Sequence, residues 1–247
     1  MRRSLYVLDP DEREQLAIGL MADWPNELPG VLIGGYAVAA YGVPRYSVDV
    51  DIVAPAVSQD GWSRWLERRH LVRFQTHQSS SLTAPPVRVE RWRHKELTVD
   101  LMTGGVRDRD SQTVIPEDWV LRNPQLRSLE LLSGRVDPPL PVVRLAGLWA
   151  LKILAGRPQD VTDLYGISTQ PVGLGEVREL FEELSSPPLE RKLARVSRLL
   201  LEPKTYVDSL SRLRRGSPEL PQNRTRWELF VRMIEGVIPT KSRARSD

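Results

Sequence analysis

The sequence contains no cysteine and only three histidines, and these two shortages exclude several kinds of functional site. Without cysteine there is no disulfide bond, no thiolate metal centre and no cysteine nucleophile. The histidines, His70, His77 and His94, are scattered along the chain, so we do not expect a histidine-rich zinc site.

Long apolar runs are also missing. None approaches the roughly 20 residues that a membrane-spanning helix needs. The opening residues, MRRSLYVLDPDEREQ, are charged almost at once and lack the apolar core of a signal peptide. We therefore expect a cytoplasmic protein with no membrane partner. The 247 residues, 40% of them hydrophobic, are enough for one large or two small domains.

The charge of the chain is unevenly distributed. Residues 185–247 carry 14 Lys and Arg against 7 Asp and Glu, whereas the rest carries 21 against 25. An acidic first part suits a metal site, and a basic last part suits a polyanion such as RNA. An arginine-rich helical surface without such a partner is the alternative.

The most informative stretch is residues 31–55, VLIGGYAVAAYGVPRYSVDVDIVAP. It opens with a short apolar run, predicted to be a strand, that stops at Gly34 and Gly35. The small apolar residues that follow suit a buried helix, and Gly42 and Pro44 end it because proline disfavours helical geometry in the residue before it.

A second strand is predicted at residues 47–53, where polar and apolar residues alternate. Asp49 and Asp51 lie two residues apart, so on a strand both side chains point to the same face. The opposite face should enter the core through Val48, Val50 and Ile52.

Two like charges side by side on a sheet face repel each other, and a divalent cation is the simplest way to offset that repulsion. Mg²⁺ prefers one or two carboxylates together with phosphate oxygens. A glycine turn before a helix lets a phosphate approach the backbone. A lone Gly-Gly is usually only a turn, and a lone Asp-x-Asp is often a solvated strand face. Together and in this order they indicate a nucleoside triphosphate site.

A further carboxylate, Asp100, lies in the predicted strand Leu97–Met102 among apolar neighbours, where it needs a partner. Asp108 and Asp110 form another Asp-x-Asp, but they sit in the turn-like segment GGVRDRD. We interpret those two as loop charges and not as metal ligands.

The order of these motifs resembles the nucleotidyltransferase superfamily related to DNA polymerase β: an apolar strand, Gly-Gly or Gly-Ser, roughly ten residues, then Asp-x-Asp on the next strand. The phrases GGYAVAAYG and PRYSVDVDI are similar to those of its AbiEii/AbiGii toxin branch. The resemblance implies Mg²⁺ or Mn²⁺ held by Asp49, Asp51 and a third carboxylate that activates the attacking hydroxyl, the position that Asp100 matches.

The phrase LKILAGRPQDVTDL, residues 151–164, resembles the second signature of AbiEii-type enzymes, in which a lysine and an aspartate are required. It implies functional roles for Lys152 and Asp160, with Gln159 where a lysine is more usual. We expect Lys152 to face the interdomain cleft and meet the triphosphate; the alternative is that it snorkels to solvent or pairs with a nearby acid. The nucleotide-binding residues implied are Gly34, Gly35, Arg45, Lys152 and Arg157.

The expected fold is α/β followed by α: residues 1–138 form a nucleotidyltransferase-fold domain with a small mixed sheet, and residues 139–247 form a helical domain that completes the cleft. The proline-rich segment Asp137–Pro141 is the expected boundary. Further expectations are a loop or weak hairpin at residues 74–86, a basic turn at residues 91–95, and a disordered tail at residues 241–247.

The function that the resemblance implies is metal-dependent transfer of a nucleoside monophosphate from a triphosphate to an acceptor hydroxyl. The branch points to tRNA 3′ ends as acceptor and to a toxin–antitoxin or phage-defence pair with a cognate antitoxin. Transfer of AMP to a protein or a small hydroxylated molecule is one alternative. A non-catalytic RNA- or partner-binding relative is another, and the intact carboxylates argue against it.

Overall fold

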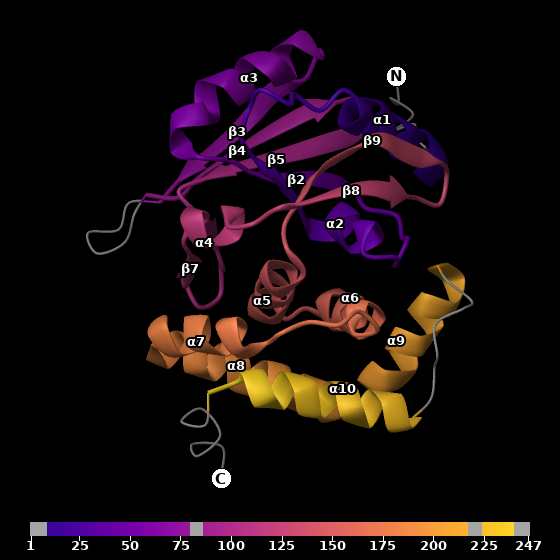
Figure 1. Cartoon of the computed structure of the whole chain (residues 1–247), viewed down its shortest axis with the longest axis vertical. Helices are drawn as coiled ribbons and strands as arrows, with labels where there is room; N and C mark the ends of the chain where they lie inside the picture. The colour runs from indigo at the N-terminus through magenta and orange to yellow at the C-terminus, as the bar shows by residue number, and fades with distance from the viewer. Residues whose placement is uncertain (1–8, 80–85, 217–223, 240–247) are drawn as a thin grey trace, which may run out of the picture.

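The protein, described here by a computed structural model for residues 9–79, 86–216 and 224–239, consists of a mixed β-sheet followed by a helical region (Figure 1). This confirms the predicted fold class, α/β followed by α. The sheet is larger than expected, with seven strands in the order β3-β4-β5-β2-β1-β9-β8.

The centre of the sheet is the pair β1 and β2, which run antiparallel to each other. On the far side of β2, β5 runs parallel to it, and on the far side of β1, β9 runs parallel to that strand. The remaining neighbours pair antiparallel. The strands are β1 (Val31–Ile33), β2 (Asp49–Val53), β3 (Val72–Gln78), β4 (Arg88–His94), β5 (Leu97–Thr103), β8 (Gln125–Glu130) and β9 (Arg135–Val142), with a separate hairpin of β6 (Val106–Arg107) and β7 (Val114–Ile115).

Helices cover both faces of the sheet. In Figure 1, α1 (Pro10–Ala22) and α3 (Gln59–Arg68) lie on one face, while α2 (Gly34–Ala40) and α4 (Glu117–Leu121) lie on the other, toward the helical region. Asp9 caps α1, since its side chain accepts a hydrogen bond from the backbone N–H of Asp11 at 2.9 Å.

The helical region begins with α5, which lies between the sheet and the outer helices (Figure 1). Ten of its residues are buried, as its nearly continuous apolar sequence predicted. None of the helices in the described ranges is long and apolar enough to cross a membrane. The helices are α5 (Leu145–Ala155), α6 (Pro158–Ile167), α7 (Gly175–Glu183), α8 (Pro187–Leu201), α9 (Pro203–Gly216) and α10 (Arg224–Val237).

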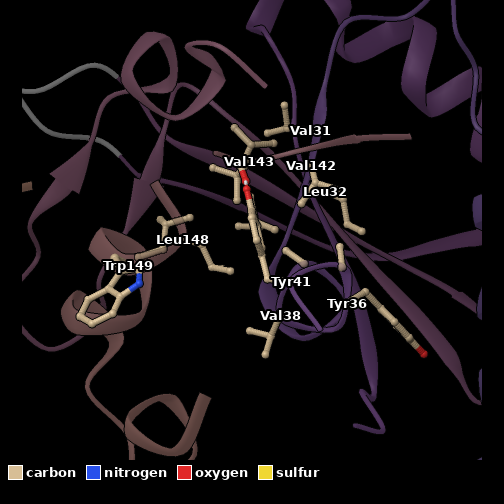
Figure 2. Close-up of a cluster of buried hydrophobic side chains, with 14 of the residues drawn as sticks. Val31, Leu32, Tyr36, Val38, Tyr41, Val142, Val143, Leu148 and Trp149 are labelled. Carbon is tan, nitrogen blue, oxygen red and sulfur yellow. Dashed lines mark hydrogen bonds between the residues drawn. The ribbon is translucent and has the colours of Figure 1, made fainter. Parts of the chain in front are cut away.

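One continuous core joins the sheet to the helical region. Figure 2 shows Tyr41 at the end of α2 lying between the strand residues and the α5 side chains Leu148 and Trp149. The Tyr41 hydroxyl also hydrogen-bonds the carbonyl oxygen of Val143 at 2.9 Å, just after β9. This contact fixes α2, which follows the glycine turn, against the start of the helical region.

Three sequence-based expectations are wrong in detail. The loop or weak hairpin expected from residue 74 is in fact the edge strand β3, and residues 80–85 lie outside the described residues. The basic turn expected at residues 91–95 belongs to β4 as far as His94. Val48 precedes β2 and is 54% exposed, so it does not enter the core.

The proline-rich segment is also not a linker, because residues 137–141 lie within β9. Proline lacks a backbone N–H and is tolerated in a strand only where a ladder bond is not needed. β9 meets β1 only where Leu32 pairs with Val142, so its prolines have a strand neighbour on one side alone. The expected tail, residues 241–247, lies outside the described residues.

Candidate active site

Three carboxylates meet at the centre of the sheet, on β2 and β5. Because the two strands are parallel and in register, Asp51 lies directly opposite Asp100, and Asp49 lies opposite Thr98. All three carboxylates are partly buried. The apolar residues Val50 and Ile52 between and after the β2 aspartates are fully buried on the opposite face. The period-2 pattern therefore places the carboxylates on one face, as predicted.

The charges of this carboxylate trio perturb one another. Burial, followed by the charges of Asp100 and Asp49, raises the pKa of Asp51 from 3.8 to about 7. Burial also raises the pKa of Asp100, against the opposing effect of Arg91. Because burial and two like charges raise the pKa of Asp51, a cation that offsets these charges would bind favourably beside it.

Two neighbouring side chains hold Asp100 and Asp49. Arg91 on β4 lies opposite Asp100 and donates to Oδ2 from Nε at 3.2 Å and from a terminal nitrogen at 3.3 Å. The Thr98 hydroxyl donates to Asp49. The sequence did not single out Arg91, because only the pairing of β4 with β5 places it opposite Asp100.

The donor chemistry of the trio fits a hard divalent cation, since Mg²⁺ and Mn²⁺ take carboxylate oxygens. Within the described residues, however, no three acidic or histidine side chains are arranged around one common point. Asp100 would have to turn from Arg91 to share a cation with Asp51. The site is thus a set of suitable ligands that is not fully assembled.

The glycine turn lies directly against these carboxylates. Gly34 has φ of 72°, a left-handed conformation that favours glycine, and an added Cβ would collide with the Asp51 carboxylate. A Cβ at Gly35 would collide with the Ser47 hydroxyl and come within 3.0 Å of the Arg45 guanidinium. Glycine is therefore required at both positions because neighbouring side chains approach the backbone closely. Phosphate binding at this turn stays a prediction.

A second buried cluster is built around Lys152, which is 4% exposed. Its Nζ donates to Asp160 at 3.0 Å and to Asp163 at 2.7 Å. Both aspartates are 1% exposed. Lys152 therefore does not reach solvent but pairs with two buried carboxylates. Its contact with a triphosphate stays a prediction.

Arginines enclose this cluster from two sides. Arg157 donates from Nε to Asp160 at 2.6 Å, and the Asp160 carboxylate also accepts from the Arg157 backbone N–H at the start of α6. Although burial opposes it, the charges of Lys152 and Arg157 hold the pKa of Asp160 below its usual range. From the loop before β2, Arg45 pairs with Asp163 at 2.8 Å.

The two clusters face each other across the junction of sheet and helices. Arg45 connects them, because it lies beside Gly35 and also binds Asp163. The charges of Lys152 and Arg157 also act on the pKa of Asp51. The structure thus brings every predicted site residue into one region, and it adds Asp163 as the acceptor shared by Lys152 and Arg45.

Asp108 and Asp110 take no part in the trio, as expected of loop charges. Instead they bind the Lys192 ammonium at 3.2 and 2.8 Å. This contact ties the β6–β7 hairpin to α8.

Comparisons with known proteins give structural likeness only. No protein-family model matches the chain, and no curated protein matches it significantly. Among solved structures, it is similar to a Helicobacter pylori protein provisionally assigned as a nucleotidyltransferase, with 16% identity over 99% of both chains and a TM-score of 0.35. A Thermotoga maritima protein with the same provisional assignment is 15% identical over 69% of this chain and 100% of its own, with a TM-score of 0.43.

The antibiotic-resistance factor ANT(2″)-Ia is also similar, at 15% identity over 83% of this chain and 97% of that one, with a TM-score of 0.35. Of these three structures, two are provisionally assigned as nucleotidyltransferases. At these identities and TM-scores, the likenesses do not by themselves assign an activity.

Proposed function

We propose that this protein is a metal-dependent nucleotidyltransferase that moves a nucleoside monophosphate from a nucleoside triphosphate to an acceptor hydroxyl. The observation that carries the proposal is the convergence of three carboxylates on adjacent strands with a glycine turn at which Asp51 touches Gly34. Carboxylates alone are common on sheets, and so are glycine turns, but carboxylates beside a glycine turn supply ligands for both a metal and a phosphate once Asp100 turns from Arg91.

In the proposed reaction the acceptor hydroxyl oxygen attacks the α-phosphorus, the bond from that phosphorus to the β-phosphate oxygen breaks, and pyrophosphate leaves. Asp49, Asp51 and Asp100 would hold Mg²⁺ or Mn²⁺. When bound, the metal supplies charge stabilisation for the entering and leaving oxygens. Asp100 accepts the hydroxyl proton, a role that its raised pKa suits.

The second cluster would serve the triphosphate. Gly34 and Gly35 allow the outer phosphates to approach the backbone. Lys152 and Arg157 carry the positive charge that faces Asp51, and Asp160 holds both of them in place. To reach a phosphate, Lys152 exchanges part of its contact with Asp160 and Asp163 for the ligand.

For the acceptor we propose a tRNA 3′ end, with the protein acting as the toxin-like component of a toxin–antitoxin or phage-defence pair. The support is the likeness of residues 34–52 and 151–164 to the AbiEii-type signatures, together with the basic last part of the chain. Within that part, Arg212 and Arg224 are exposed. The side chains of Arg214 and Arg215 in the same part lie outside the described residues.

The direct test incubates purified protein with each of the four labelled triphosphates, Mg²⁺ or Mn²⁺, and a panel of acceptors: total tRNA, small hydroxylated compounds and protein. We expect label to join tRNA, with pyrophosphate released in equal amount. Asp49→Asn and Asp51→Asn should abolish transfer without loss of fold. Wild-type turnover in either variant, or no transfer to any acceptor, would contradict the proposal.

A further inference from the structure

A basic hollow of about 610 Å³ opens beside the candidate active site. Its walls come from the β6–β7 hairpin, the turn between α5 and α6, and the second half of α8. It is lined by Asp110, Gly156, Arg157, Pro158, Arg195, Arg198, Leu199 and Glu202. We call it the α8 hollow.

We propose that the α8 hollow binds the phosphodiester backbone of a single-stranded nucleic acid acceptor and leads its 3′ end to the carboxylate trio. This inference rests on the proposed function and adds to it a surface and a chemical class of ligand. The residues of α8 that it adds belong to neither the glycine turn nor the Lys152 cluster.

Along α8, three arginines form an exposed stripe. Arg191, Arg195 and Arg198 follow one another at intervals of four and three residues, so they share one helix face. The helical rise separates them by about 6 and 4.5 Å along the axis. Successive phosphates of a strand can therefore each meet one guanidinium, which binds phosphate through paired N–H donors.

The stripe is not neutralised by the rest of the described chain. Arg191 and Arg198 form no ion pair with any described residue, whereas Arg195 pairs with Asp110 at 2.8 Å. Two exposed guanidinium groups thus stay available for a ligand.

The wall opposite the stripe is preformed. The buried ammonium of Lys192 fixes Asp108 and Asp110 of the hairpin against α8. Gly156, which also lines the hollow, packs closely against α8, because an added Cβ would come within 2.5 Å of the Val196 side chain. Its φ of 57° also favours glycine. The hollow therefore needs no rearrangement to exist.

The hollow adjoins the Lys152 cluster. Arg157 lines the hollow and also donates from Nε to Asp160 of that cluster at 2.6 Å. At the hairpin tip, Arg109 is close enough to Asp100 to oppose the rise that burial causes in the pKa of that carboxyl. A strand that follows the arginines thus ends where the acceptor hydroxyl must react.

The hollow suits a strand better than the triphosphate itself. Asp110 and Glu202 also line it, and their charges would repel a compact polyphosphate. A phosphodiester strand carries one charge per nucleotide and can pass between these acids while it contacts the arginines.

The test measures binding of a 5′-fluorescein-labelled single-stranded RNA of about ten nucleotides, a length within usual single-strand site sizes, by anisotropy. The full chain is used in EDTA and without triphosphate, so that binding is independent of catalysis. The test variant is Arg191→Gln/Arg198→Gln. The control, Arg64→Gln/Arg68→Gln on α3, removes the same charge from two exposed positions on the other face of the sheet.

We expect the test variant to bind RNA at least tenfold more weakly at low salt, and its log K against log salt slope to flatten by about 1.4, or 0.7 for each lost phosphate contact. The control should match the wild type. Affinity for a labelled triphosphate with Mg²⁺ should be unchanged in both variants.

Equal RNA binding by both variants would overturn the inference, as would loss of triphosphate binding in place of RNA binding. The inference would also be overturned if hexaglutamate displaced the labelled RNA as effectively as an unlabelled RNA of equal charge, because that result points to an acidic protein partner. If the wild type modifies a small hydroxylated compound but binds no RNA, this inference fails and the proposed function stands. If RNA binding depends on the stripe but no nucleotidyl transfer occurs, this inference stands and the proposed function fails.

Discussion

Replacing Asp51 with asparagine should stabilise the metal-free protein at alkaline pH. Asn keeps the shape of the side chain and removes the charge that burial, Asp100 and Asp49 penalise. The folded pKa of about 7 lies some three units above the ordinary value of 3.8. At 1.36 kcal/mol per unit, the charged form costs about 4 kcal/mol at most, and partial solvent access lowers this to about 2–4 kcal/mol.

The pH dependence has a definite sign. Because the folded pKa of Asp51 is the higher one, its contribution to stability is fully present below the unfolded pKa and is lost as pH rises through about 7. At pH 5 the unfolded chain has already lost the proton that the folded wild type still holds, so Asp51→Asn should gain about 1 kcal/mol there, less than half of its gain at pH 8. At pH 8 the gain should be complete.

Thermal unfolding in EDTA at pH 5 and pH 8 measures both values. For a chain of this size, about 2–4 °C of Tm corresponds to 1 kcal/mol, so a gain of about 2–4 kcal/mol should raise the Tm by about 4–16 °C at pH 8. Glu67→Gln, at an exposed position on α3, is the matched control and should change neither value. Mg²⁺ should raise the Tm of the wild type at pH 8 and leave that of Asp51→Asn unchanged. A variant that melts below the wild type at pH 8, or that gains equally at both pH values, would refute the electrostatic reasoning.

Three further substitutions test the site. Lys152→Met should lower the free energy of unfolding in urea by about 2–4 kcal/mol, because it leaves buried carboxylates short of a counter-charge; a neutral result would show that those carboxylates are protonated. Gly34→Ala should lower stability clearly more than Gly42→Ala and should abolish nucleotide transfer. Both glycines have positive φ, but only Gly34 has atoms within 4 Å of the added Cβ. Equal losses of stability would mean that backbone strain, and not the collision with Asp51, causes the effect. Arg91→Gln should increase the Mg²⁺-induced rise in Tm at pH 8, because it frees Asp100 from a competing cation, and a smaller rise would contradict that role.

The sequence alone determined the local parts of this protein, because they depend on neighbours a few residues apart. Residues 31–55 predicted strand, glycine turn, helix and strand, and the alternation around Asp49 and Asp51 fixed the face that both occupy. Similarly, α6, α8 and α9 each begin at a proline, because proline is well suited to the first position of a helix.

The tertiary structure decided the pairings between distant segments. Nothing local to β5 shows that Asp100 lies opposite Asp51, because strand register depends on how the whole sheet packs. Edge position explains why β3 has no apolar periodicity to detect: most of it is exposed, and only its ladder with β4 holds it.

The state of Lys152 was likewise beyond local reasoning. An apolar helix with one lysine predicts that the ammonium needs a partner, but not which one. Only the packing of α5 against α6, with Arg45 from the loop before β2 paired to Asp163, brings Asp160 and Asp163 to it and makes burial of the charge tolerable. Sequence therefore named the chemical groups of the candidate site, and the fold decided which of them meet, because charges interact through space and not along the chain.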